Sequence, residues 1–503
     1  MAKNIDCLLI GGGPTGMALA LELATQKGIT FRIIDKATKR SPYSRALVMQ
    51  PRTLELLRRH GPITDLINAG NPADGASICV QGKIIVDMNV ADVAITVEMG
   101  IQAKSITQDA EGVTVVTSTE DGSEEVIRAK YVIGADGAHS AVRHAAENLT
   151  FDGDAYRQEF ILADCHLKSD RPPNRAYMCL GKGLMVVLPM STSGLVRLVV
   201  SRPGQDNSRD PKLEDFEEFL QEVFPGGGSL HDPTWITRFR LHHRGVNSYR
   251  DRRLFVAGDA AHIHSPAGGQ GMNTGIQDSI NLGWKLGAVL RNEKPDSFLD
   301  SYQDERHPVG QRLLASTDRM FTYVTTTNPI LLFLRNLILP WVLPLVTMDK
   351  SRMRNQLMFQ SQLKIRYRHS NIVGTAAGFP GPLQGGSRAP DAKIKTTDGE
   401  KWLLGLLSPE SHHLLLFSGM DSGASEGDLC RAEETFLGHA QANAKVHMIF
   451  NKEHSEGGGY VDVEDKLHES YGFKDAGYAL VRPDCYLAHI GPLSAVDEAA
   501  KWL

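Results

Sequence analysis

The sequence lacks three features that mark large classes of protein: paired cysteines, an excess of basic residues, and long unbroken apolar segments. Its six cysteines are scattered over 503 residues without a C-x-x-C pair. This spacing argues against a zinc ribbon and a dithiol redox centre, and the sequence singles out no metal ligands. Lys and Arg number 54 against 59 Asp and Glu, a formal net charge of −5, and form no basic stripe. Nucleic acid is therefore not an expected partner.

The chain also shows little sign of targeting. Its first ten residues hold no basic segment followed by an apolar one, so we expect no secretory signal and a cytoplasmic location. One stretch, Pro329–Met348, approaches the length of a membrane span, but Arg335 lies inside it and Pro340 and Pro344 would break its helix. We interpret it as a buried or interfacial helix pair, with no transmembrane span; a monotopic membrane contact is the alternative.

The N-terminal residues contain a glycine-rich turn between a strand and a helix. A short apolar run, Ile5–Ile10, leads into GGGPTG, which matches G-x-G-x-x-G through Gly11, Gly13 and Gly16. A helical pattern follows over Met17–Gln26. In a dinucleotide-binding unit these glycines allow a tight turn and let the backbone approach a pyrophosphate at the helix N-terminus.

An acidic residue stands where such a unit requires one. A second strand is expected over Ile29–Ile34 and ends at Asp35, 19 positions after Gly16. A carboxylate about 20 residues beyond the glycine turn binds the ribose of a dinucleotide. The whole register of strand, turn, helix, strand and acid is far more specific than the glycines alone.

A second glycine-rich turn lies near residue 260. Arg252–Val256 is predicted as a buried strand that leads into Gly258 and Asp259. A loop rich in Gly and Pro, SPAGGQG, then precedes a helix with apolar residues at helical spacing, namely Met272, Ile276, Ile280 and Trp284. A bare loop at a helix N-terminus brings N–H groups and about half a positive charge toward a ligand.

The rest of the chain divides by pattern. Period-two segments near Ile78–Thr117 predict a β-rich insertion, as one face of a substrate domain. Strands are expected over Phe160–Val200 and Trp235–Leu241, with a helix at Leu213–Val223 between them. Long helices are expected over Leu299–Leu314 and Pro329–Arg368. Further on come a Gly/Pro-rich linker, 374–390, and a small α/β unit from about Asp391.

Three motifs in this order resemble those of the class A flavoprotein monooxygenases, the single-component aromatic hydroxylases. They are the Gly11–Gly16 turn, Gly134-Ala135-Asp136-Gly137 after a predicted strand, and Gly258-Asp259 with its loop. Flanking segments match as well: Arg45-Ala46, Arg52–Glu55, Gly283–Leu286, Tyr302–Arg306, and in the tail Arg388–Asp391 and Val481–Asp484. The tail resembles the C-terminal thioredoxin-like domain of the phenol hydroxylase and polyketide hydroxylase branch.

The resemblance implies an α/β fold with a Rossmann-like FAD-binding domain, an inserted mixed β-sheet substrate domain, long helices and a C-terminal thioredoxin-like domain. Because the tail lacks C-x-x-C, it should be structural or oligomeric, and a homodimer is a hypothesis that the tail and the apolar stretch both allow. The implied units are 1–75, 126–155 and 246–370 (FAD-binding), 76–125 (β-rich insertion), 156–245 (substrate domain), 371–390 (linker) and 391–503 (thioredoxin-like).

The resemblance also implies how FAD lies. Asp35 would hold the adenosine ribose, Arg45 the phosphates and Asp259 the ribityl chain. Asp136, with Gly137 beside it, would bridge the FAD and NADPH regions. The loop from Pro266 to Gly271 would lie beside the isoalloxazine, whose N1/O2 edge would face the N–H groups of Gly271, Met272 and Asn273. A helix N-terminus there would favour the anionic reduced flavin.

The implied reaction belongs to the cofactor. NADPH, or NADH, would reduce FAD by hydride transfer, and reduced flavin would take up O2 as a C4a-hydroperoxide that hydroxylates a phenolic or polyketide-like aromatic. There is no second glycine fingerprint, so the nicotinamide would have no domain of its own. The residues leave the catalytic base open; His242, His243 and Arg244 are candidates, and an ordinary polar role on a strand is the alternative for each.

One segment departs from the family pattern. Met88–Val93 runs almost directly into Ala94–Gly100, so a helix that the family usually has there is missing, with the glutamine that helps to hold the flavin. Two other functions therefore stay open: an epoxidase or Baeyer–Villiger-type monooxygenase of secondary metabolism, and a flavin-binding protein without turnover.

Overall fold

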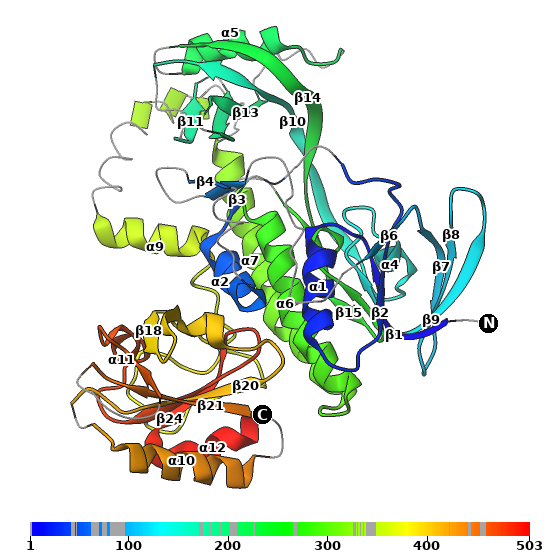
Figure 1. Cartoon of the computed structure of the whole chain (residues 1–503). Helices are drawn as coiled ribbons and strands as arrows, with labels where there is room; N and C mark the ends of the chain where they lie inside the picture. Colours follow the sequence, from blue (N-terminus) through cyan, green and yellow to red (C-terminus); the bar gives the residue numbers. More distant parts are fainter. Residues whose placement is uncertain are drawn as a thin grey trace.

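The structure, a computed structural model, describes most of the chain (Figure 1). The described residues are 3–41, 46, 48–61, 70–72, 78–80, 96–170, 175–181, 183–191, 193–201, 209–224, 227–264, 269–324, 328, 330–331, 333–334, 337–338, 349–421, 423–440, 444–452 and 459–503. All statements below on what the molecule contains or lacks refer to these residues.

An eight-stranded sheet forms the centre of the first domain. Its main path is β15-β16-β9-β1-β2-β6, and β8 and β7 extend it antiparallel from β9. The pairs β16–β9, β9–β1, β1–β2 and β2–β6 are parallel. The strands are β1 (Lys3–Ile10), β2 (Phe31–Asp35), β6 (Val97–Met99), β7 (Gln102–Gln108), β8 (Val113–Ser118), β9 (Glu124–Gly134), β15 (Arg250–Asp251) and β16 (Leu254–Val256).

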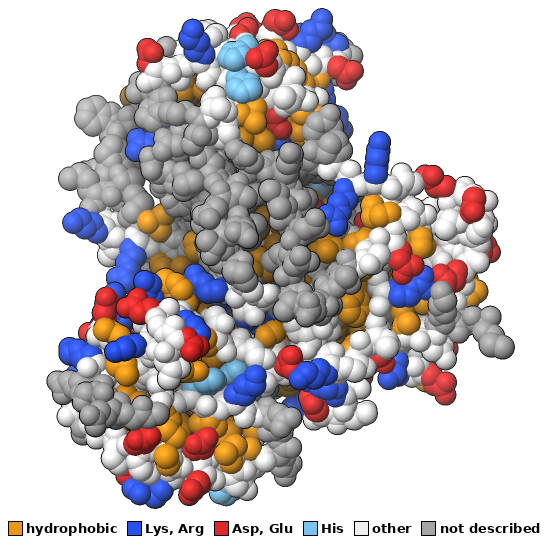
Figure 2. Space-filling model, viewed as in Figure 1, with side chains coloured by type: hydrophobic (Ala, Val, Ile, Leu, Met, Phe, Trp, Pro, Cys, Tyr) orange, Lys and Arg blue, Asp and Glu red, His pale blue; other side chains and the backbone are white. Residues whose placement is uncertain are grey.

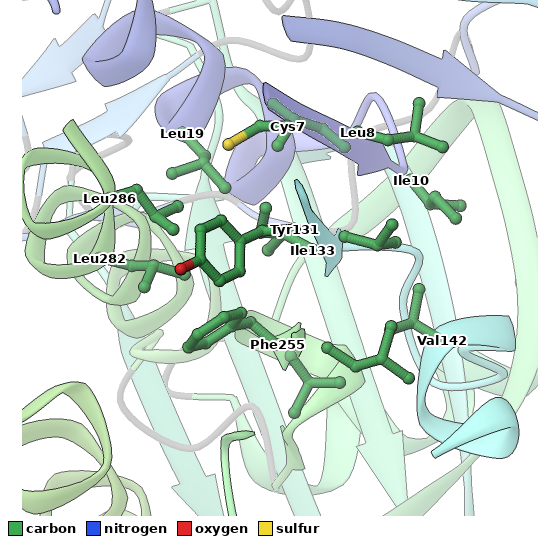
Figure 3. Packing of buried hydrophobic residues seen from close by; sticks show 14 of the residues in the cluster. Cys7, Leu8, Ile10, Leu19, Tyr131, Ile133, Val142, Phe255, Leu282 and Leu286 are labelled. Carbon is green, nitrogen blue, oxygen red and sulfur yellow. The ribbon is translucent and has the colours of Figure 1, made fainter. Parts of the chain in front are cut away.

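Helices cover this sheet and close its core. Apolar residues of β1, β9 and β16 meet those of α1 (Pro14–Thr25) and α6 (Gly271–Leu290), as Figure 3 shows for Leu19, Leu282, Leu286 and Phe255. Strand β1 is covered on both faces, so Cys7 to Ile10 are all buried and form a continuous apolar run. The remaining helices here are α2 (Pro51–Leu57), α4 (Ala141–Ala145) and α7 (Asp300–Val324).

A second sheet of six strands forms the substrate domain, with α5 (Leu213–Val223) against one face, toward the top of Figure 1. The helix begins and ends at the predicted residues. The strand order of the sheet is β11-β12-β13-β10-β14-β17. The bounds are β10 (Phe151–Lys168), β11 (Tyr177–Leu180), β12 (Leu184–Pro189), β13 (Leu195–Ser201), β14 (Ser229–Val246) and β17 (His262–Ile263). A third, separate sheet consists of the short strands β3 (Val48–Met49), β5 (Ile78–Val80) and β4 (Gly70–Pro72).

The C-terminal residues form the α/β unit that the sequence predicts, seen at the lower left of Figure 1. Its likeness to thioredoxin stays a prediction. The strand order is β19-β18-β22-β21-β20-β23-β24, with β20 and β21 parallel and β23 and β24 antiparallel. The elements are β18 (Lys393–Thr396), β19 (Gly399–Trp402), β20 (His412–Phe417), α10 (Glu426–His439), β21 (Ala444–Phe450), β22 (Tyr460–Val461), α11 (Lys466–Tyr471), β23 (Gly477–Val481), β24 (Leu487–Pro492) and α12 (Val496–Ala499).

Three expectations from the sequence need correction. The strands of 97–118 belong to the nucleotide-binding sheet, because β6 pairs with β2 and β8 with β9, so they form no face of the substrate domain. Of Pro329–Arg368, the part from 349 holds only α9 (Lys350–Gln360) and then turns, since the chain after Gln362 must reach Tyr367 beside the C-terminal unit. The expected linker 374–390 is anchored: Gly374 and Gly386 donate backbone bonds to Ala488 and Leu487.

A buried polar network joins the first domain to the C-terminal unit. The carboxylate of Glu305 on α7 accepts from Lys285 of α6 at 2.8 Å and from Arg482 beyond β23 at 2.6 and 2.8 Å. Arg482 also binds Asp484, and Asn281 bridges the carboxylates of Glu305 and Asp484 at 2.7 and 3.0 Å. These cationic partners hold the pKa of Glu305 well below its usual range despite burial, which raises it.

We expect Arg482→Met to destabilise the protein by about 3–5 kcal/mol, because it leaves two carboxylates buried without their guanidinium. Arg431→Met in α10 is the control: its ion pair with Asp428 is exposed, so about 1 kcal/mol or less is expected. Urea unfolding followed by circular dichroism measures both. Equal effects of the two substitutions would contradict a structural role for the network.

A pair of histidines in the C-terminal sheet, His413 and His447, is held neutral. His413 donates through Nε2 to the carbonyl of Ser408 at 3.1 Å, so its Nδ1 accepts from Nε2 of His447 at 2.8 Å. Protonating His413 would set two donors against each other. Burial, with His447 nearby, lowers the pKa of His413 to about 3, and burial lowers the pKa of His447 to about 4.

Both pKa values lie below those of the unfolded chain, so stability is present above about pH 6.5 and is lost as the pH falls toward 4. At pH 5 each group costs up to about 2 kcal/mol. We expect the thermal midpoint to fall between pH 7 and pH 5, and to fall less in His413→Gln than in the exposed control His439→Gln on α10. An identical fall in both variants would refute the assignment.

Candidate active site

The two glycine-rich turns, far apart in the sequence, lie against each other. A Cβ on Gly16 would stand 1.9 Å from the carbonyl oxygen of Gly11, and one on Gly258 would stand 2.5 Å from Oγ1 of Thr15. Gly258 also has φ +60, a left-handed conformation that glycine adopts without strain. Ser279 of α6 donates to the carbonyl of Thr15 at 2.7 Å. Both turns therefore need glycine, and together they form one surface.

Two helices point their N-termini at this surface. The N-cap of α1 is Gly13 and that of α6 is Gln270, and neither helix has a capping side chain or an acidic residue in its first turn. The first N–H groups of a helix have no intrahelical partner and attract negative charge. A Cβ on Gly13 would meet no atom within 4 Å, so the turn is open on its outer side. A pyrophosphate fits the first of these ends and an anionic flavin edge fits the second.

Asp35 is at the end of β2, beside the first turn. One carboxylate oxygen accepts from the N–H of Gly12 at 2.7 Å and the other from the N–H of Ala37 at 2.8 Å. The side chain is thus fixed next to the glycines, where a ribose hydroxyl could reach its remaining lone pairs. Its role as the ribose ligand stays a proposal.

Asp259 and Asp136 follow the ends of neighbouring strands, β16 and β9. Asp259 lies in a 3-10 turn, Gly258–Ala260, and is exposed. Asp136 is largely buried, and one of its oxygens accepts from the N–H of Ala141 at the start of α4 at 2.6 Å. Burial raises the pKa of Asp136. The adjacent Gly137 has φ +78.

Asp278, which was not among the predicted site residues, fixes the second turn. Its carboxylate accepts from the N–H of Gly258 at 3.1 Å, from His262 at 2.9 Å and from Arg306 at 2.7 Å. Arg306 also donates to the carbonyl of Thr274. Asp278 therefore positions the backbone next to Asp259 from behind, on the buried face of α6. Its only signal in the sequence is that it is the one acidic residue of α6, among several other polar side chains.

The start of α6 is held from within. The side chain of Asn273 is fully buried: Oδ1 accepts from the N–H of Gln50, and Nδ2 donates to the carbonyls of Val48 and Gly269, each at 2.8 Å. This fixes the loop in front of Gly271 and Met272. Asn273 could therefore contribute only its backbone N–H group to a cofactor.

Some predicted residues cannot be placed, and one prediction is wrong. Arg45 and Pro266, and residues 81–95 with most of the shortened insertion, lie outside the described residues. The fork of a guanidinium suits phosphate oxygens, so the sequence alone makes Arg52 a second phosphate candidate beside Arg45. In the structure Arg52 is buried, pairs with Glu55, and donates to the carbonyls of Asp484 and Cys485. A ring of Tyr486 lies 4.7 Å from its guanidinium. Arg52 is an anchor for the C-terminal unit.

The three candidates for a catalytic base lie on β14. Apolar Phe239 and Leu241, four and two positions before His243, lie on the sheet face opposite α5. His243 contacts Tyr156, with ring centroids 6.5 Å apart. By strand alternation Arg244 and His242 point to the other face. His243 is therefore the candidate on the apolar face.

Among the described residues no helix is long and apolar enough to cross a membrane.

The comparisons with known proteins agree with this geometry. A family model described as FAD binding domain matches residues 4–92 and 82–317, more than half of the chain. The two matched parts overlap over residues 82–92, at the stretch where the family's helix is predicted to be missing.

Two relatives and one solved structure match over most of their length. "Uncharacterized aromatic compound monooxygenase YhjG" of Bacillus subtilis is 32% identical, covering 79% of this chain and 82% of that protein. 6-Methylpretetramide 4-monooxygenase of Streptomyces rimosus is 31% identical, covering 98% and 92%. The crystal structure of CabE, an aromatic hydroxylase from angucycline biosynthesis, is 26% identical with a TM-score of 0.74, covering 97% and 96%. The chain therefore belongs to the FAD-dependent monooxygenase family of aromatic hydroxylases.

We expect Gly13→Ala to fold with unchanged stability but to bind FAD at least tenfold more weakly, because its Cβ enters only the open space over the first turn. Flavin content and FAD affinity by fluorescence quenching measure the effect. Gly438→Ala is the matched control, since its Cβ also meets no atom and it lies within α10. Normal FAD affinity in Gly13→Ala would place the pyrophosphate elsewhere.

Proposed function

We propose that the protein hydroxylates an extended phenolic or polyketide-like aromatic, with NADPH or NADH as reductant and O2 as oxidant. The observation that carries this proposal is the full-length likeness to 6-methylpretetramide 4-monooxygenase, which spans the substrate sheet and the C-terminal unit as well as the FAD-binding domain. When bound, FAD supplies the hydride acceptance and oxygen activation of the reaction.

The apolar face of the six-stranded sheet, called here the substrate sheet, is suited to bind an aromatic substrate. Its face opposite α5 carries Phe160, Phe239 and Leu241, with ring centroids of the two phenylalanines 5.7 Å apart. On the same face, Leu188 and Leu195 pack on Val48 of β3. Val48 also lies against Gly269, the described residue that precedes the flavin helix by two positions. The apolar face thus continues toward the expected flavin position.

The chain's own residues would then hold and shield the reacting groups. Uncapped α6 would stabilise negative charge on the flavin edge, since its N–H groups are oriented by the fold before the reaction. Asp278 and Asn273 would keep that helix end and the Gly258 turn in place. The apolar face would exclude water, which limits unproductive release of H2O2. His243 would accept the proton of a phenolic hydroxyl.

The test is a screen of the FAD-loaded protein against monocyclic phenols, carboxylated phenols and tri- or tetracyclic phenols. We expect polycyclic phenols to raise NADPH oxidation most and to yield a product heavier by one oxygen atom, with label from 18O2. His243→Gln should lower kcat with little change in KM, and the lower rate should depend less on pH.

Each other outcome favours a different function. An epoxide or an inserted lactone oxygen would indicate the epoxidase or Baeyer–Villiger alternative. Yellow protein that oxidises no NADPH with any compound would support a flavin-binding protein without turnover. The Gly13→Ala protein, low in FAD, gives the background rate.

A further inference from the structure

A cluster of two histidines and an aspartate lies at the far end of the substrate sheet. His166 of β10 and His231 of β14 are paired across the two antiparallel strands, and their rings stack with centroids 5.3 Å apart and planes 12° apart. One potential ligand atom from each of them and one from Asp232 lie within 4.8 Å of one another. In Figure 2, histidine side chains reach the surface beside acidic ones at the end of the molecule that Figure 1 gives to this sheet.

The backbone brings the aspartate to the histidine pair. The register of β10 and β14 shifts between Asp164 and His166, where β14 has extra residues. Such a bulge redirects the side chains beside it. Asp232 has φ +50, and its carboxylate is 2.8 Å from Nδ1 of His231. A carboxylate bound to one imidazole nitrogen orients the ring and leaves the other nitrogen for a ligand.

The histidine on β10 has an unused nitrogen. Nδ1 of His166 is buried and has no hydrogen-bond partner among the described residues. A buried polar atom without a partner is uncommon and costly. His231 and Asp232 are exposed, with half and three-quarters of their side chains accessible, so both can rotate toward it.

The cluster differs from a second group with similar spacing in the C-terminal unit, Asp462, Asp465 and His468. There one oxygen of Asp462 already accepts from two backbone N–H groups and from His468. Asp465 is paired with Lys452 at 2.9 Å. Oδ1 of Asp462 and Nε2 of His468 also lack a partner among the described residues, but both side chains are fully buried and Asp465 is held by Lys452. The group of the substrate sheet, in contrast, is open to solvent at His231 and Asp232.

The geometry points to a divalent transition-metal site, of the kind that takes Zn²⁺, formed by His166, His231 and Asp232. Two imidazoles and one carboxylate suit Zn²⁺, which is held at about 2.0–2.2 Å from such atoms with a remaining position for water. Closing the three side chains around the ion would tie β10 to the bulge of β14. The site lies apart from the flavin surface, does not rest on the proposed function, and its role is to bind and stiffen this end of the sheet.

The test is calorimetric titration of Zn²⁺ into tag-free, FAD-loaded protein that has been treated with a chelator. We expect one saturable site per chain, a rise in thermal midpoint on adding Zn²⁺, and weaker binding as the pH falls from 7.5 to 6, because the imidazoles must be neutral. His166→Ala and His231→Ala should each weaken binding at least tenfold, and Asp232→Asn less so.

His439→Ala removes an exposed histidine on α10 and should leave Zn²⁺ binding unchanged. Circular dichroism and flavin content show that each variant is folded. No saturable binding by the wild-type protein, or equal Zn²⁺ affinity in the wild type, His166→Ala and His231→Ala, would overturn the assignment.

Discussion

One buried carboxylate, that of Glu305, holds the molecule's two halves in register. It receives a lysine from the flavin helix and an arginine from the C-terminal unit, and a serine, Ser370, donates to it at 2.7 Å from the segment between. A charge so far from water is stable only when every lone pair is used. The position of α7 against α6, and of the C-terminal unit against both, is fixed by that requirement.

Helix α6 links the network around Glu305 to the surface formed by the two glycine turns. On α6, Lys285 and Asn281 belong to the network around Glu305, Asp278 fixes the turn at Gly258, and Asn273 fixes the loop in front of the helix. Charged and amide groups thus follow one another along this buried helix and tie it to several parts of the chain. The backbone N–H groups at its N-terminus are thereby oriented before any cofactor binds.

Patterns local in the sequence predicted most of the fold. The glycine turn, the helix at Leu213–Val223, the helix after the second turn and the α/β character of the C-terminal unit follow from periodicity and turn chemistry within a few dozen residues. What failed depends on distant partners. Arg52 resembled a phosphate ligand because nothing near it in the sequence shows that Tyr486 and the carbonyls of residues 484 and 485 would surround it.

For the site, the structure tests only where the predicted residues lie, and it brings the two predicted glycine turns together. Glycines at both turns could be found because a backbone conformation or a close approach demands them. Asp278 could not, because a charged residue on a buried helix has many possible partners and only the fold selects Gly258, His262 and Arg306. The segment 374–390 has the composition of a free linker, yet its backbone pairs with β24.

The apolar cluster between the two units has a further meaning for how the chain can be divided. Leu21 and Ile280 of the first domain share one continuous core with Leu404, Phe417 and other residues beyond 390. Separating the chain near residue 390, where its composition changes, would therefore expose apolar surface on both fragments. The C-terminal unit therefore completes the core of the first domain, and the two are expected to unfold as one cooperative body.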